Sequence, residues 1–159
     1  MERGKDNFKI VSGGQTGADR AALDWAIQNG IPHGGWCPKG RKAEDGRIDR
    51  RYSLRETPTI KYNQRTEWNV RDSDATVIFS TVPVLTGGSK STIEFANKLR
   101  KPCLMLYRES GEIKPTVLLN QFIEEHKVRV LNVAGARASN EPTIEAFVKE
   151  VLNRWWAKY

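Results

Sequence analysis

Short apolar runs that alternate with helical patterns define the expected architecture of the chain. Residues 75–80, Ala-Thr-Val-Ile-Phe-Ser, are β-branched and almost wholly apolar, as expected of a strand buried on both faces. From about Asn140, apolar side chains instead recur at the three- and four-residue spacing of an amphipathic helix. These two criteria predict strands at residues 8–12, 31–36, 75–80, 103–107 and 128–133, and helices at 21–29, 63–71, 93–100, 115–127 and from about 140.

This alternation predicts an α/β fold, a doubly wound and mostly parallel sheet of about five strands with helices on both faces. A chain of 159 residues fits one domain, residues 1–159. We expect the strands, numbered along the sequence, to lie in the order 2-1-3-4-5. Ligands of such folds bind outside the carboxyl ends of the strands, where the order reverses. The loops after strands 1, 3 and 5 are therefore the expected ligand site.

The first of these loops is rich in glycine and opens a helix. Its sequence from Ser12 to Arg20 is Ser-Gly-Gly-Gln-Thr-Gly-Ala-Asp-Arg. Glycine lets the backbone approach a ligand closely, and the N–H groups and dipole of a helix N-terminus favour an anion. The spacing matches neither the dinucleotide fingerprint nor the Walker loop. We expect it to bind an anion such as phosphate; a tight turn with a capped helix is the alternative.

Two further loops add similar groups. Residues 86–92, Thr-Gly-Gly-Ser-Lys-Ser-Thr, precede the third predicted helix, so their N–H and hydroxyl groups could surround an oxyanion. Capping of that helix by Ser89 or Ser91 is the alternative. Glu94 follows one turn later, either as a ligand contact or as a solvated acid. Gly135 and Arg137 follow the fifth strand.

Positive charge is concentrated in one segment. The formal net charge is +7, and residues 39–55 hold seven basic residues against three acids. Such a concentration attracts anions. The segment has only Tyr52 as an aromatic residue and no nucleic-acid-binding motif, so we expect a small polyanion rather than nucleic acid.

The apolar runs, cysteines and histidines of the chain indicate where the protein works and which chemistry to expect. No apolar run has the length of a membrane span, and we expect no secretory signal before the first strand. Cys37 and Cys103 fit neither a metal-site spacing nor a disulfide framework, so we expect buried thiols and a cytoplasmic protein. His33 and His126 have no partner pattern for acid–base chemistry and are expected to be ordinary residues.

The order of these motifs resembles the molybdenum cofactor carrier protein family. The resemblance extends from about Ile10 to Ser139, and no single motif carries it. It implies a Rossmann-like fold in the superfamily that includes cytokinin-activating phosphoribohydrolases and lysine-decarboxylase-like proteins. It also implies a homotetramer that binds and protects molybdenum cofactor without catalysis. Besides the glycine loop, the motifs are residues 34–41, 43–46, 51–52, 56–57, 69–74 and 86–89.

Two alternative functions remain open at this stage. Hydrolases of the superfamily carry P-G-G-x-G-T-x-x-E, and residues 86–94 keep two glycines and Glu94 at the same offset, but Lys90 replaces the third glycine. That replacement alters how closely a nucleotide can approach. A nucleoside-monophosphate phosphoribohydrolase using Glu94 is therefore one alternative, and a nucleotide-sensing module is the other.

The carrier hypothesis defines an expected binding site. Molybdenum cofactor is a pterin with a terminal phosphate and an oxo-molybdenum dithiolene; glycine loops suit the phosphate, while arginine and lysine suit the oxo groups. The expected partners are this anionic ligand, molybdenum enzymes that accept it and cofactor-biosynthesis proteins, with no nucleic acid and no membrane. No catalytic residue and no protein–metal bond are expected. The expected ligand contacts are Gly13, Gly14, Gln15, Thr16, Gly17, Asp19, Arg20, Lys39, Arg41, Thr86, Gly87, Gly88, Ser89, Lys90, Ser91, Thr92, Glu94, Gly135 and Arg137.

Overall fold

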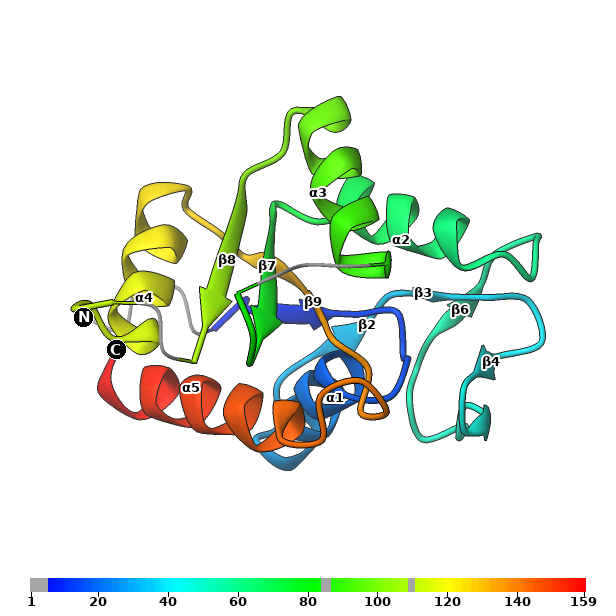
Figure 1. The fold of residues 1–159 in the computed structure, drawn as a ribbon, viewed down its shortest axis with the longest axis horizontal. Coiled ribbons are helices and arrows are strands. Elements are labelled where there is room, and N and C mark those ends of the chain that lie inside the picture. Colours follow the sequence, from blue (N-terminus) through cyan, green and yellow to red (C-terminus); the bar gives the residue numbers. More distant parts are fainter. Residues whose placement is uncertain (1–5, 84–86, 109–110) are drawn as a thin grey trace.

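The main sheet has five parallel strands in the order β2-β1-β9-β7-β8 (Figure 1). A computed structural model describes residues 6–83, 87–108 and 111–159. The sheet confirms the predicted α/β doubly wound architecture. Its strands are β1 (Lys9–Val11), β2 (His33–Gly34), β7 (Ala75–Ser80), β8 (Cys103–Tyr107) and β9 (Val130–Gly135).

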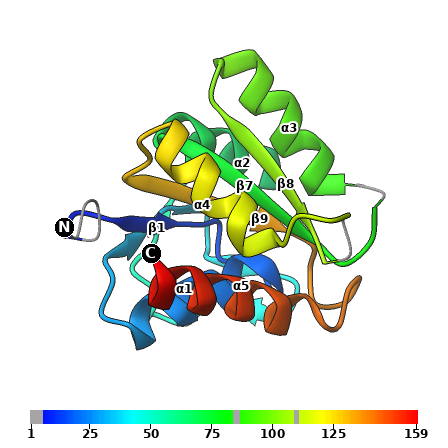
Figure 2. The ribbon, with the colours of Figure 1, turned by 90° about the vertical axis from the view of Figure 1, so that its left-hand side faces the viewer.

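Helices cover both faces of this sheet (Figure 2). α1 and α5 pack against each other on one face and α4 contacts α5, while α2 and α3 pack together on the other. None of the helices in the described part of the chain combines the length and apolar character needed to cross a bilayer. The helices are α1 (Ala18–Gln28), α2 (Tyr62–Arg71), α3 (Gly87–Leu99), α4 (Pro115–Glu125) and α5 (Ile144–Lys158).

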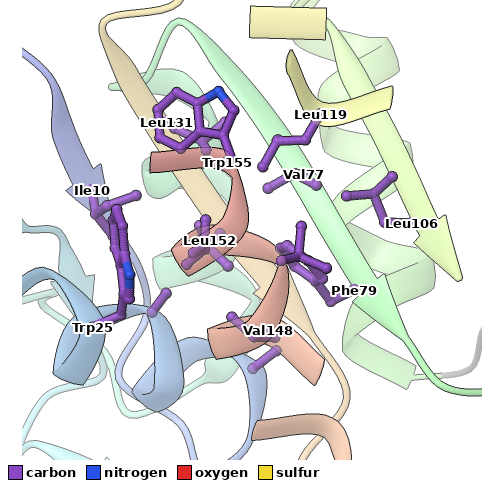
Figure 3. Packing of buried hydrophobic residues seen from close by; sticks show 14 of the residues in the cluster. Ile10, Trp25, Val77, Phe79, Leu106, Leu119, Leu131, Val148, Leu152 and Trp155 are labelled. Atoms are coloured by element: carbon purple, nitrogen blue, oxygen red, sulfur yellow. The ribbon is translucent and has the colours of Figure 1, made fainter. Parts of the chain in front are cut away.

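The larger apolar core lies between the sheet and helices α1, α4 and α5 (Figure 3). Val77 and Leu152 are fully buried there, and burying a side chain of this size stabilises the fold by about 1.5–3 kcal/mol. Trp25 is also buried, and its indole N–H donates to Asn153 Oδ1 over 2.8 Å. The core thus fixes α1 and α5 against the strands and leaves the carboxyl ends of the strands free for a site.

The predicted strand order was wrong in one respect. β9, the last strand in the sequence, lies between β1 and β7 and pairs with both, with Ile10 opposite Leu131 and Val77 opposite Val133. Apolar patterns identify strands but do not specify non-local pairing, and a right-handed crossover can reach either side of β1. The loop after β9 therefore adjoins the glycine loop directly.

Several element boundaries also differ from prediction. The second predicted strand divides at Gly35, whose φ is 127° and where an added Cβ would lie 2.3 Å from Ser12 O. α3 begins at Gly87, so Ser89 and Ser91 lie inside the helix instead of capping it. α5 begins at Ile144 rather than near 140.

The basic segment, residues 39–55, in which the sequence predicted no strand or helix, packs around a small core of its own. Leu23 of α1 packs there with Cys37, Ala43, Ile48 and Tyr52, all buried. The sequence did not predict these contacts, because each strand of this region is only two residues long and too short to show a periodic pattern. The strands are β3 (Trp36–Cys37), β4 (Lys42–Ala43), β5 (Gly46–Arg47) and β6 (Arg55–Glu56).

Candidate anion-binding site

A cavity of about 480 Å³ opens where the loops after β1 and β9 meet α2 and the first turns of α3. This volume lies within the usual range for small-molecule sites. Most of its lining side chains are polar. They include Gln15, Asp19, Tyr62, Asn63, Arg65, Thr66, Asn69, Ser89, Ser91, Thr92, Asn132, Arg137, Ser139, Asn140 and Glu141.

An ion pair forms one buried wall of the cavity. Arg65 Nη1 lies 3.2 Å from Asp19 Oδ2 and donates to Gly13 O over 2.9 Å. Both side chains are 10% exposed. Burial raises the pKa of Asp19, and the positive charge of Arg65 opposes that rise. An added Cβ at Gly13 would lie 2.1 Å from Arg65 Nη1, so a larger residue there would displace the guanidinium from this position.

Two buried N–H donors at this wall have no hydrogen-bond partner in the described part of the chain, namely Arg65 Nε and Gln15 Nε2. The orientation of the Gln15 amide follows from its oxygen, which accepts from Thr16 N (3.1 Å) and Glu44 N (2.8 Å). Leaving a buried donor unsatisfied costs about 1–3 kcal/mol. Because Arg65 and Gln15 both line the cavity, a ligand whose acceptor oxygens reached these two groups would remove this cost.

The glycine loop does not present its backbone amides as predicted. Gln15 N donates to Asp19 Oδ2 (3.2 Å), and Ala18 N donates to Ala136 O (3.0 Å). The protein's own carboxylate and carbonyl therefore occupy the positive end of α1. The cause is the position of β9, which brings Ala136 against Gly17, where an added Cβ would lie 2.2 Å from Ala136 O.

The structure brings about half of the predicted contacts together. The start of α3 lines the cavity beside the loops after β1 and β9, so two of the three predicted loops are joined by a helix N-terminus whose dipole favours anions. Predicted residues that line the cavity are Gly13, Gln15, Asp19, Gly87, Gly88, Ser89, Ser91, Thr92, Gly135 and Arg137.

The other predicted contacts lie elsewhere. Arg20 pairs with Asp45 (2.5 Å), and the buried Arg41 guanidinium donates to backbone carbonyls, including Tyr52 O over 2.8 Å. Arg41 thus stabilises its own loop, a role that charge alone did not reveal. Thr86 lies outside the described residues. Predicted residues that do not line the cavity are Gly14, Thr16, Gly17, Arg20, Lys39, Arg41, Lys90 and Glu94.

Sequence reasoning missed the contribution of α2. Tyr62, Arg65, Thr66 and Asn69 lie at i, i+3, i+4 and i+7, so one helix face points polar groups into the cavity. The Arg137 guanidinium lies 4.9 Å from the centroid of the Tyr62 ring, within cation–π range. The recurrence of polar residues at this helical spacing was the feature of the sequence that could have identified α2 as part of the site.

Glu44 joins three segments at the rim of the cavity. Its carboxylate accepts hydrogen bonds from Thr16 Oγ1 and from Ser139 Oγ (2.7 Å) and lies 3.9 Å from Arg137 Nη1. The hydrogen bonds from Ser139 and Thr16 hold the pKa of Glu44 below its usual value. The hairpin of β4 and β5 is thereby fixed to the loops after β1 and β9.

The two cysteines differ in their exposure to solvent. Cys37 is buried, whereas Cys103 is partly exposed, and burial raises the pKa of Cys103 to about 11. Both thiols are free. Across the described ranges, no group of three His, Cys, Asp or Glu side chains is placed to hold a metal ion.

Comparison with known proteins agrees with the resemblance noted in the sequence. Residues 10–156 match the model of the circularly permutated YpsA SLOG family. A crystal structure of a "Putative molybdenum carrier protein" from Syntrophus aciditrophicus SB is 49% identical. That match covers 92% of this chain and 93% of the other, with a TM-score of 0.89. No curated protein matches the sequence.

Proposed function

The chain belongs to the circularly permutated YpsA SLOG family, and on this basis we propose that it binds and carries molybdenum cofactor in the cavity beside Arg65, without catalysis. The observation that carries the proposal is the pair of buried, unsatisfied donors Arg65 Nε and Gln15 Nε2. The name of the structural relative supports a molybdenum-containing cargo.

The cavity suits a ligand with acceptors at more than one end. One group of donors lies at Arg65 and Gln15, and another at the start of α3, where Gly87 and Ser89 line the cavity. A helix N-terminus favours a phosphate, and an arginine favours an oxyanion. The pterin phosphate and the oxo groups of the metal provide such acceptors. We further propose a cytoplasmic homotetramer that delivers this cargo to molybdenum enzymes.

Cofactor retention tests the proposal. The protein is mixed with molybdenum cofactor and passed over a sizing column, and pterin is quantified in the protein peak at low and high salt. We expect pterin to co-elute at low salt and to be lost in part as salt rises, because salt screens the partly exposed Arg137 of the cavity but screens the buried Arg65 much less. The sizing column also reports the number of subunits.

A matched pair of variants locates the site. Arg65→Lys keeps a positive charge beside Asp19 but removes the Nε donor, and should lower pterin retention about tenfold, as expected for a lost charge-assisted hydrogen bond. Arg71→Lys changes an exposed arginine of the same helix and should retain pterin fully. Equal retention in both variants would contradict the site, and release of free base from AMP would instead indicate a phosphoribohydrolase.

A further inference from the structure

A second hollow, of about 350 Å³, lies on the opposite face of β1 from the larger core. Ile10 packs into that core, so Lys9 and Val11, which alternate with it along β1, face the other way. Together with Gly34 of β2, they line the hollow, and Trp36 and Arg55 line it as well.

Among the residues that the structure describes, the two cations of this hollow, Lys9 and Arg55, lack counterions. The Lys9 stem crosses Gly34, where an added Cβ would lie 3.1 Å from Lys9 Cε and 3.2 Å from Nζ. Within residues 6–83, 87–108 and 111–159, neither the Lys9 ammonium nor the Arg55 guanidinium has a side-chain hydrogen bond or ion pair. Asp72, an acid at the edge of the hollow, is already paired with Arg71 over 2.8 Å.

The neighbouring side chains leave this charge uncompensated. His33 accepts a hydrogen bond from Ser53 N at Nε2 (3.1 Å), and both burial and the charge of Lys9 lower the pKa of His33. The His33 imidazole is therefore neutral. It adds no positive charge to the hollow, and it does not neutralise the charge of Lys9. An anion bound in this hollow would therefore meet two cations that have no counterion among the described residues, and this local positive charge favours its binding.

An aromatic surface adjoins these cations. Trp36 is only partly buried, and the Arg55 guanidinium lies 5.8 Å from its ring centroid. Its indole N–H donates to Asp72 Oδ2 (2.8 Å), and its ring meets Trp68 edge-on at 4.8 Å. These contacts fix the indole in place beside the hollow, where a flat ligand can pack against it.

We propose that this hollow binds an organic anion that bears a carboxylate or phosphate on a flat ring. Lys9 and Arg55 donate to the oxyanion, and Trp36 with Val11 contacts the ring. The site is separate from the cavity at Arg65. Among the described lining residues the two share Asn69, whose amide holds the Trp36 backbone through hydrogen bonds of 2.8 and 2.9 Å.

Nuclear magnetic resonance of the ¹⁵N-labelled full chain tests this proposal. Benzoate serves as the carboxylate probe and phenyl phosphate as the phosphate probe, and the signals followed are the Trp36 indole N–H and the Gly34 amide. We expect saturable shifts of both signals with at least one probe, and the stronger probe identifies the oxyanion. Absence of a saturable shift with both probes would overturn the proposal.

Variants separate this site from the cavity at Arg65. Lys9→Met retains the apolar stem over Gly34 but removes the charge, and we expect it to weaken probe binding about tenfold, as should Arg55→Met. Arg47→Ala removes an exposed cation that does not line the hollow and should leave binding unchanged. Arg65→Lys should also leave it unchanged, whatever its effect on pterin. Wild-type affinity in both Lys9→Met and Arg55→Met would overturn the proposal.

Discussion

At the scale of single residues, the ion pair of Arg65 and Asp19 determines whether the cavity wall is stable. Both side chains are nearly removed from solvent, and burial already raises the pKa of Asp19 despite the nearby guanidinium. Removing one partner of a buried ion pair costs about 3–5 kcal/mol, because the other charge is left without compensation. The pair therefore serves both the fold and the proposed ligand.

We expect Arg65→Ala to lower the free energy of unfolding by about 3 kcal/mol in urea denaturation at pH 7. The double variant Asp19→Asn with Arg65→Met should recover much of this loss, because it removes both charges. Arg71→Ala, which breaks an exposed pair on the same helix, should cost less than about 1 kcal/mol. An Arg65→Ala loss as small as that of Arg71→Ala would show that the buried pair is not structurally important.

At the scale of elements, the contact between the glycine loop and the loop after β9 depends on Gly17. Its φ is 85°, and an added Cβ would lie 2.2 Å from Ala136 O and 2.7 Å from Ala138 N, both backbone atoms. Gly17→Ala must therefore separate the two loops. We expect Gly17→Ala to lower the free energy of unfolding, measured in urea, by about 3 kcal/mol or more.

Gly30→Ala is the matched control for Gly17→Ala. Gly30 also has a positive φ, 66°, but has no atom within 4 Å of an added Cβ. Gly30→Ala should therefore lower the free energy of unfolding by only about 1 kcal/mol, the cost of placing alanine in a backbone conformation that favours glycine. Similar losses for the two variants would show that the close approach of the loops contributes nothing to stability.

The hairpin of β4 and β5 is held to the cavity rim by Glu44, and this attachment should depend on pH. The folded-state pKa of Glu44 is lower than its usual value because Ser139 and Thr16 donate hydrogen bonds to the carboxylate. The resulting stability is present above the usual pKa of 4.5 and is lost as the pH falls through the lower folded-state pKa. Glu44→Gln should therefore cost about 1 kcal/mol at pH 7 and progressively less below pH 4.5.

Urea unfolding of wild type and Glu44→Gln between pH 3 and pH 7 measures this difference. Glu150→Gln provides the control, because Glu150 forms an exposed pair with Arg154 within α5. Glu150→Gln should lower the free energy of unfolding by less than about 0.5 kcal/mol at every pH. A Glu44→Gln effect that is independent of pH would contradict a role for the ionised carboxylate.

At the scale of the whole molecule, local patterns predicted the elements but not their arrangement. Residues 75–80 and 103–107 form strands with the predicted bounds because a continuous apolar run is a local property. The place of β9 depends on pairing with β1 and β7, which local patterns do not encode. For the same reason, the charge of Arg41 suggested a ligand contact, whereas its burial among backbone carbonyls shows a structural role.

The strand order itself suggests why the prediction failed. If the chain began at α4, its strands would follow in the order β9, β1, β2, β7, β8, and the observed sheet would read 3-2-1-4-5, the common order of doubly wound folds. The family to which the chain belongs is described as circularly permutated. The first and last elements also lie together, since the Phe8 ring is 5.0 Å from Trp155 and 6.3 Å from Trp156.

A permuted chain should therefore fold. We would join Tyr159 to Asp6 by about eight Gly and Ser residues and open the chain between Gly111 and Glu112, which are exposed and precede α4. The permutant should keep the helical circular dichroism and cooperative urea unfolding of the original chain, because every strand pair is retained. Opening the chain between Val77 and Ile78 breaks the buried strand β7 and should abolish folding. An unfolded first permutant would show that folding requires β1 and α1 to precede the rest of the sheet.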